Sequence, residues 1–250
     1  MGNEDKVEFK ALLYGPPGVG KTTFVGSGAT DPRCWPGIVL DLENGVLSIR
    51  SKTRKIKLED IGKVDPEPGK FDSVKITSWS QLGEAYNAIA DAETPYKLVC
   101  IDTLSEASYL CLAEIIDDER SKSSKREDKD APEIQDYNVS LIRMRKLLRY
   151  FVNLDAHVIL TSSAVVNINP RTKLPRAEPG LQGKMILEAP HLVSTTGYFD
   201  VTADKDRILY LDADEKFIAK NRTEGDSLGS ELINPTLPQV LDLIEQGDTQ

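Results

Sequence analysis

A nine-residue segment near the N-terminus constrains the fold of this chain more than any other feature. Residues 15–23 read Gly-Pro-Pro-Gly-Val-Gly-Lys-Thr-Thr and satisfy the pattern G-x-x-x-x-G-K-[ST] in full. With glycine at about 7% of residues, a chance match in such a chain has odds of roughly one in a hundred. An apolar run at residues 9–14 precedes the motif, and a helix can follow it to about Ser27. This order predicts a strand, a phosphate-binding loop and a helix.

Each residue type in the motif suits phosphate binding for its own physical reason. Glycines allow positive φ, which lets backbone N–H groups converge on phosphate oxygens. We expect Lys21 to place its charge on the β- and γ-phosphates of a nucleotide and Thr22 to offer its hydroxyl to Mg²⁺. The sequence therefore predicts ATP and Mg²⁺ as ligands. The predicted nucleotide-binding residues are Gly15, Pro16, Pro17, Gly18, Val19, Gly20, Lys21, Thr22 and Thr23.

Acidic residues at the ends of two further apolar runs are candidates for the rest of a nucleotide site. Asp102 follows the run Lys97–Ile101 and is predicted to complete the Mg²⁺ site with Thr22. Glu43 follows the run at residues 37–42, where a carboxylate can orient an attacking water. Asp41 lies two residues earlier and projects the same way if the strand continues, so it competes with Glu43 for the role of catalytic base.

Composition excludes several other classes of protein. The chain has 250 residues, 40% hydrophobic and 28% charged, which is typical of a globular protein with one large α/β domain. Apolar runs are too short to span a bilayer, and the polar N-terminus predicts no secretion signal. Three cysteines and two histidines make a zinc site improbable and fit a reducing cytoplasm. A net charge of −9 excludes a generally basic nucleic-acid coat, although a local basic loop remains compatible with it.

Strand-like and helix-like segments alternate along the chain, which predicts a parallel sheet covered on both faces. We expect buried strands at 9–14, 37–42, 71–76, 97–101 and 157–161, and short antiparallel strands at 197–202, 207–212 and 216–220. The sequence predicts one domain over 1–250, with a core at about 8–222 and a helical extension at 223–250. Segment 120–133 is expected to be a charged loop, and 165–184 a long loop punctuated by proline and glycine.

Four segments together resemble the core of RecA-type ATPases: GPPGVGKTT, IVLDLENG, LVCIDT and HVILTSS. The resemblance covers about residues 8–222 and implies a RecA-like P-loop NTPase core in which Glu43 is the catalytic base and Asp102 the strand-end aspartate. FIAKNR, residues 217–222, is similar to a K-x-R segment of RecA-like hexameric helicases. That similarity implies that Lys220 and Arg222 reach the nucleotide of a neighbouring subunit, in a ring or filament of identical chains.

The compact length resembles, more narrowly, the phage-encoded ATPases of the Sak single-strand annealing group. This resemblance implies a role on single-stranded DNA in homologous recombination or annealing, in the cytoplasm of a bacterial host. A single-stranded DNA-binding protein is a further candidate partner. The chain departs from the RecA pattern at Thr161-Ser162-Ser163, where the family carries a glutamine that senses the γ-phosphate. Here a hydroxyl must do that work, or nothing does.

The segment 165–184 is the first candidate for binding single-stranded DNA. In RecA-like proteins the matching loop faces the central axis and contacts DNA. Four cations oppose the single acid Glu178 in this segment, and such cations give sequence-independent, salt-sensitive binding. They are Arg171, Lys173, Arg176 and Lys184. The basic run from Arg50 to Lys57 is the second candidate, and solvated surface is the alternative for both.

Two other functions remain open from the sequence. The sequence Gly-Pro-Pro-Gly at the start of the loop suggests an AAA+-type remodeller or loader. Against this, Asp102-Thr103 replaces the Asp-Glu of many AAA+ ATPases. A small-molecule kinase of the P-loop class is the third alternative, with segment 120–133 as a weak imitation of an arginine-bearing lid.

Overall fold

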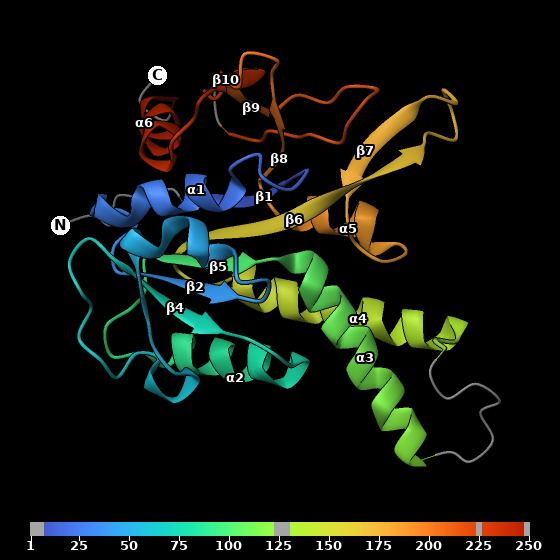
Figure 1. The fold of residues 1–250 in the computed structure, drawn as a ribbon, viewed down its shortest axis with the longest axis horizontal. Coiled ribbons are helices and arrows are strands. Elements are labelled where there is room, and N and C mark those ends of the chain that lie inside the picture. Colours follow the sequence, from blue (N-terminus) through green and yellow to red (C-terminus); the bar gives the residue numbers. More distant parts are fainter. Residues whose placement is uncertain (1–7, 123–130, 224–226, 248–250) are drawn as a thin grey trace.

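A computed structural model describes residues 8–122, 131–223 and 227–247. A mostly parallel sheet runs through the molecule, with helices on both of its faces (Figure 1). In sheet order its strands are β10 (Glu231–Ile233), β9 (Arg207–Tyr210), β8 (Thr195–Val201), β1 (Lys10–Gly15), β6 (His157–Ile168), β5 (Leu98–Asp102), β2 (Gly37–Asp41), β4 (Phe71–Lys75) and β3 (Thr53–Lys55), while β7 (Pro175–Pro179) pairs with β6 beyond the sheet. The α/β fold class is confirmed, including the antiparallel strands at the C-terminal end.

The strand order places β6 between the phosphate-loop strand and the strand that ends in Asp102. β6 pairs in parallel with β1 on one side, where Leu13 faces Thr161, and with β5 on the other, where Ile101 faces Leu160. Because β1 and β5 run parallel to β6 and end at the same edge of the sheet, the loop after β1 and the carboxylate of Asp102 lie on either side of β6.

Successive side chains of the central strands point to opposite faces and so build two cores. Leu12, Leu40 and Leu160 pack in one core, and their neighbours Leu13 and Val39 in the other. The helices are α1 (Lys21–Gly26), α2 (Trp79–Ala90), α3 (Leu104–Lys122), α4 (Ile134–Val152), α5 (Met185–Leu192) and α6 (Leu237–Gly247).

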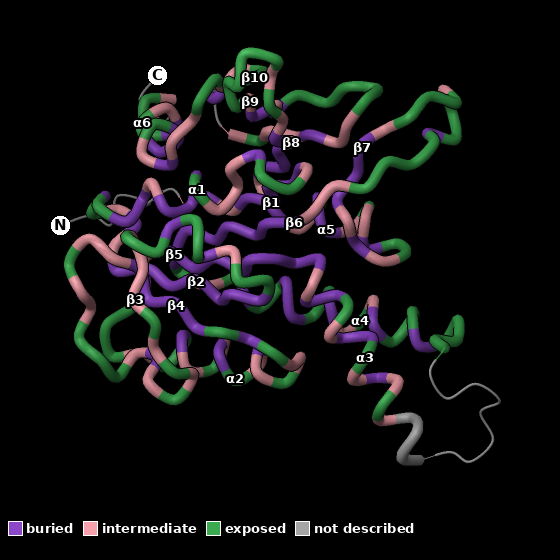
Figure 2. The backbone as a smooth tube through the Cα atoms, viewed as in Figure 1, coloured by how far each residue is buried: buried purple, intermediate pink, exposed green. Residues whose placement is uncertain are grey.

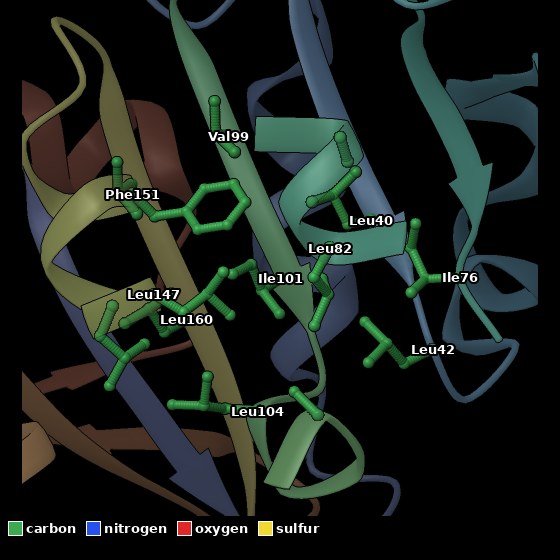
Figure 3. Packing of buried hydrophobic residues seen from close by; sticks show 14 of the residues in the cluster. Leu40, Leu42, Ile76, Leu82, Val99, Ile101, Leu104, Leu147, Phe151 and Leu160 are labelled. Carbon is green, nitrogen blue, oxygen red and sulfur yellow. The ribbon is translucent and has the colours of Figure 1, made fainter. Parts of the chain in front are cut away.

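Helices α2, α3, α4 and α5 cover the first core. Figure 3 shows Phe151 and Leu147 of α4 and Leu82 of α2 against the strand residues Ile101 and Leu160. Helices α1 and α6 cover the second core, where Phe24 lies edge-on to Phe199 at 5.7 Å. Because the helices cover the two faces of the sheet, the loops lie at the edge where the parallel strands end. Across the described parts of the chain, no helix combines the length and the apolar character needed to cross a membrane.

Two expectations about the C-terminal half are wrong. Residues 165–184 are not one long loop: β6 continues to Ile168, and β7 returns beside it as an antiparallel hairpin that projects from the sheet and is largely exposed (Figure 2). The prolines that mark a loop in the sequence, Pro175 and Pro179, are the first and last residues of β7. An edge strand tolerates proline because one of its sides makes no ladder hydrogen bonds.

The expected strand at 216–220 is also absent from the described residues. The segment crosses other strands instead of following one: Phe217 bridges Ala177 of β7, and Lys220 bridges Thr196 of β8. The strand that pairs with β9 is β10. Most of the predicted charged loop, residues 123–130, lies outside the described residues, and α3 extends to Lys122, into the first residues of that predicted loop.

Candidate nucleotide site

The loop between β1 and α1 has the backbone geometry that phosphate binding requires. Gly18 and Gly20 adopt positive φ angles of 80° and 101°, which a residue with a side chain rarely adopts. Gly20 is the N-cap of α1, so the positive end of the helix faces into the loop. The six residues of α1 therefore start where the motif predicts, at Lys21.

Lys21 turns its ammonium back onto the loop. Its Nζ donates to the carbonyl oxygens of Gly15 and Pro16 at 2.8 and 2.9 Å. Burial lowers the pKa of Lys21, while the nearby negative charges of Asp102 and Glu43 oppose that shift. The charge is thus held at the mouth of the loop, close to both acids that the sequence singled out.

The carboxylate of Asp102 accepts hydrogen bonds from two threonine hydroxyls. Thr22 Oγ1 donates to its Oδ2 at 2.9 Å, and Thr161 Oγ1 of β6 donates to its Oδ1 at 2.5 Å. The side chain is almost fully buried, and this burial raises the pKa of Asp102, with Glu43 adding to the rise. The two hydroxyls hold the carboxylate beside the start of α1, as a strand-end aspartate in a phosphate-loop site requires.

Glu43 and Asp41 have different environments. The exposed side chain of Glu43 accepts a hydrogen bond from Thr103 Oγ1 at 2.7 Å. Asp41 is buried, and its Oδ1 accepts from the backbone N–H of Gly45 at 2.9 Å, which braces the turn after β2. Burial raises the pKa of Asp41. Glu43 is therefore the carboxylate open to solvent, and Asp41 supports the turn that carries it.

The turn that carries Glu43 packs directly against the other acid. A Cβ placed on Gly45 would lie 2.3 Å from Asp102 Oδ2 and 3.3 Å from Thr22 Oγ1. Any side chain at this position would displace the carboxylate, so glycine is required for the close approach. The peptide bond between Asp102 and Thr103 is cis, and Thr103 Oγ1 also accepts from Glu106 N at the start of α3.

The residues present fit a nucleotide with Mg²⁺. Thr22 and Asp102 offer a hydroxyl and a carboxylate oxygen side by side, and both are ligand types that Mg²⁺ prefers. Groups of three or more His, Cys, Asp or Glu suited to a metal ion are absent from the described residues. A site with one hydroxyl and one carboxylate suits Mg²⁺, which keeps waters and takes its other ligands from substrate phosphates.

Within the described residues, Lys220 and Arg222, the other two predicted catalytic residues, form no hydrogen bond or ion pair with the phosphate loop of their own chain. Lys220 is half-buried, and its Nζ donates to the carbonyls of Pro190, in α5, and Val193, the latter at 2.7 Å. Burial lowers the pKa of Lys220 to about 8. Arg222 is exposed. Lys220 thus anchors the end of α5 within its own chain.

The predicted DNA-binding cations divide into two groups. Arg171 and Lys173 are exposed in the turn of the β6–β7 hairpin, and Lys184 is exposed at the N-cap of α5. Arg176 instead forms an ion pair with Glu178 on its own strand, with Nε 2.9 Å from Oε1. In the second candidate run, Arg54 pairs with buried Asp72 at 2.5 Å. Arg171 Nη2 lies 4.0 Å from Glu215 Oε1, and both side chains are largely exposed. The most exposed cations of the segment are therefore those of the hairpin turn and Lys184.

One site residue escaped assignment from the sequence: Thr103, which contacts Glu43. Its hydroxyl follows a strand that ends in a recognisable acid, which is the signal that could have marked it. The sequence offered Thr161 only as one of three hydroxyl residues in place of a γ-phosphate sensor, and in the structure Thr161 contacts Asp102. Ser162 and Ser163, which follow Thr161, hydrogen-bond Ser105 of α3 at 3.0 and 2.9 Å.

Fold and site together define an α/β P-loop nucleotide-binding domain. Comparison with protein families agrees: the model of a family described as an AAA domain matches residues 8–223. The match spans most of the chain, so the protein belongs to this family of P-loop ATPases. No curated protein matches the sequence significantly.

Proposed function

We propose that the chain hydrolyses ATP with Mg²⁺, using Glu43 as the catalytic base. The hydrogen bond from Thr103 to Glu43 carries this proposal, because it fixes an exposed carboxylate within the charge network of Lys21 and Asp102. Mg²⁺ held by Thr22 and Asp102 would neutralise charge on the phosphates. Glu43 would orient the attacking water and accept its proton, while Lys21 would bind the transferring phosphoryl group.

Substitution of the two competing acids tests this assignment. Glu43→Gln should retain ATP binding and slow hydrolysis about 10²–10⁴-fold, the usual contribution of a general base. Asp41→Asn should act mainly on stability, since Asp41 holds the backbone of Gly45. Phosphate release and ATP affinity are measured for both. Hydrolysis at the normal rate by Glu43→Gln would transfer the role to another group.

The proposed substrate of the ATPase cycle is single-stranded DNA, in recombination or annealing. The β6–β7 hairpin supports this, because β6 contacts the nucleotide site through Thr161 and ends in an exposed turn bearing Arg171 and Lys173. Val166, Ile168 and Leu174 expose apolar surface beside those charges. A projecting basic turn on a strand of the nucleotide site suits nucleotide-dependent contact with a phosphate backbone.

The salt dependence of binding to an oligonucleotide tests the DNA site. The double substitution Arg171→Ala/Lys173→Ala should weaken binding and reduce the slope of log K against log salt by roughly 1.4, at about 0.7 per lost single-strand phosphate contact. Lys146→Ala/Arg149→Ala on α4 removes the same charge from exposed positions elsewhere and should leave the slope unchanged. Equal slopes for the two double variants would place the DNA elsewhere, with residues 50–57 next.

Assembly of identical subunits completes the proposal. Arg222 is exposed and is proposed to reach the nucleotide of the next subunit, as the K-x-R resemblance implies. Such a head-to-tail contact closes into a ring or propagates as a filament. The hairpins would then line a common path for the DNA.

A remodeller or loader of other proteins is the second candidate function, and membership of the AAA domain family favours it. The two functions differ in what stimulates hydrolysis. Single-stranded DNA should stimulate a recombination ATPase, whereas a remodeller responds to its protein substrate.

A further inference from the structure

Arg207 begins β9 at the edge of the sheet where the phosphate loop lies. It pairs with Val201 at the end of β8, and β8 runs parallel to β1. Leu209, two residues along β9, points to the same face and is buried in the core under α1. The side chain of Arg207 therefore extends on the α1 face, beyond the ends of β1 and β8.

The guanidinium of Arg207 lies against the last glycine of the phosphate loop. A Cβ placed on Gly20 would be 2.6 Å from Arg207 Nε, 2.7 Å from its Cδ and 3.1 Å from its Cζ. The ammonium of Lys21, in contrast, contacts the carbonyls of Gly15 and Pro16 at the beginning of the loop. The loop thus has a cation at each end, both from the same chain.

The charge of Arg207 has no anionic partner among the described residues, and the side chain is exposed. Several other arginines pair with a carboxylate of the chain, namely Arg33, Arg54, Arg143, Arg145, Arg171 and Arg176. An unpaired guanidinium beside the phosphate loop adds to the positive potential that the backbone N–H groups of that loop create.

A clamp on the backbone fixes the position of Arg207. Asn234 Oδ1 accepts from Arg207 N at 2.9 Å, and Asn234 N donates to Arg207 O at 2.7 Å. Asn234 Nδ2 donates to Asp206 Oδ1 at 2.8 Å, so that this neighbouring carboxylate is engaged by an amide. Asn234 adopts a positive φ of 48°, which asparagine tolerates better than most residues. A fixed backbone lowers the entropy lost when the side chain binds a ligand.

We propose that Arg207 binds a phosphate oxygen of the nucleotide held by the phosphate loop of its own subunit. The side chain then closes the loop at Gly20 and supplies a guanidinium in cis, separate from Arg222, which is proposed to act in trans. This assignment rests on the proposed nucleotide binding.

Isothermal titration of the full chain with Mg·ATP tests the proposal. Arg207→Ala should bind ATP about 10- to 100-fold more weakly, as expected for the loss of one charge-assisted hydrogen bond. Arg207→Lys, which keeps the charge without the fork of donors, should give an intermediate affinity. Arg149→Ala is the matched control, because it removes an exposed arginine from α4 on the opposite face of the sheet. It should bind within about twofold of the unmodified chain. Thermal unfolding establishes that each variant is folded.

Competition by inorganic tripolyphosphate separates phosphate recognition from contact with base or sugar. Arg207→Ala should weaken tripolyphosphate and ATP by similar factors. Loss of ATP affinity with unchanged tripolyphosphate affinity overturns the phosphate contact, as does an Arg207→Ala variant that binds like Arg149→Ala. Mixing Arg207→Ala with Lys21→Ala should give no more hydrolysis than Arg207→Ala alone, and a gain on mixing would overturn the action in cis. If the unmodified chain binds no ATP, the proposed nucleotide site is refuted. If Lys21→Ala loses ATP binding but Arg207→Ala keeps it, the nucleotide site stands and only the role of Arg207 is refuted.

Discussion

The hydrogen bond between Thr103 and Glu43 makes a quantitative prediction about catalysis. Thr103→Val removes the hydroxyl that holds Glu43 Oε1 at 2.7 Å. A hydrogen bond to a charged group contributes about 1.5–3 kcal/mol, and about 1.36 kcal/mol changes a rate tenfold. Because Glu43 is exposed, water can replace part of the lost interaction, so we expect the lower end of this range. The kcat for ATP should fall about tenfold, with the affinity for ATP unchanged.

The same hydroxyl accepts from Glu106 N at 3.3 Å, so the substitution also weakens the start of α3. Loss of such a cap costs about 1 kcal/mol of folding free energy, which a domain with roughly 5–15 kcal/mol of stability survives. Thr103→Ser keeps the hydroxyl and should restore most of the rate. Urea unfolding of both variants separates the loss of stability from the loss of rate.

A double-mutant cycle shows whether Thr103 acts through Glu43. In a chain that already carries Glu43→Gln, there is no base left to orient, so Thr103→Val should lower the residual rate less than about threefold. Steady-state phosphate release from the four chains gives the coupling. An equal loss in both backgrounds would refute the reasoning, because it would mean that Thr103 acts through Asp102 or through the fold.

Further substitutions test other parts of the structure. Lys21→Ala should abolish tight Mg·ATP binding and leave the fold intact, as measured by titration and circular dichroism, since the ammonium of Lys21 donates to loop carbonyls and lies near the charges of the site. Arg222→Ala mixed with Lys21→Ala should recover some hydrolysis if Arg222 acts on a neighbouring subunit, and mixtures that co-assemble without activity would contradict this. Asp72→Ala should lower the free energy of unfolding by about 2–4 kcal/mol in urea, because it leaves the partly buried guanidinium of Arg54 unpaired.

The sequence predicts the parts of the site that are contiguous in the chain. The loop from Gly15 to Thr23 and the strand ending in Asp102 are marked by local patterns, because phosphate binding dictates residue types at fixed spacing and a buried strand is continuously apolar. The N-cap of α2 depends on an equally local pattern, because Ser78 Oγ accepts from Gln81 N three residues later at 3.4 Å.

Features that depend on distant pairing could not be read in the same way. Thr103 and Glu43 are 60 residues apart, and their contact exists because β2 and β5 are neighbours. The β6–β7 hairpin could not be predicted because its prolines favour a loop in the sequence, although an edge strand tolerates them. The sequence predicts Lys220 as a cation available to a neighbouring subunit, but its Nζ donates to backbone carbonyls at the end of α5.

β6 gives the proposed ATPase and DNA-binding activities a common structural element. Thr161 donates to Asp102 at the nucleotide site, and Ile168, seven residues further along the same strand, lies in the exposed hairpin about 23 Å away at the usual rise of a strand. The intervening Ser163 pairs with Gly15 of β1, so β6 is fixed to the phosphate loop up to the point where the hairpin leaves the sheet. The contact between Thr161 and Asp102 therefore joins the nucleotide site to the strand from which the hairpin extends. Ser105 of α3 contacts Ser162 and Ser163 of the same strand, which fixes α3 to β6 just before the hairpin.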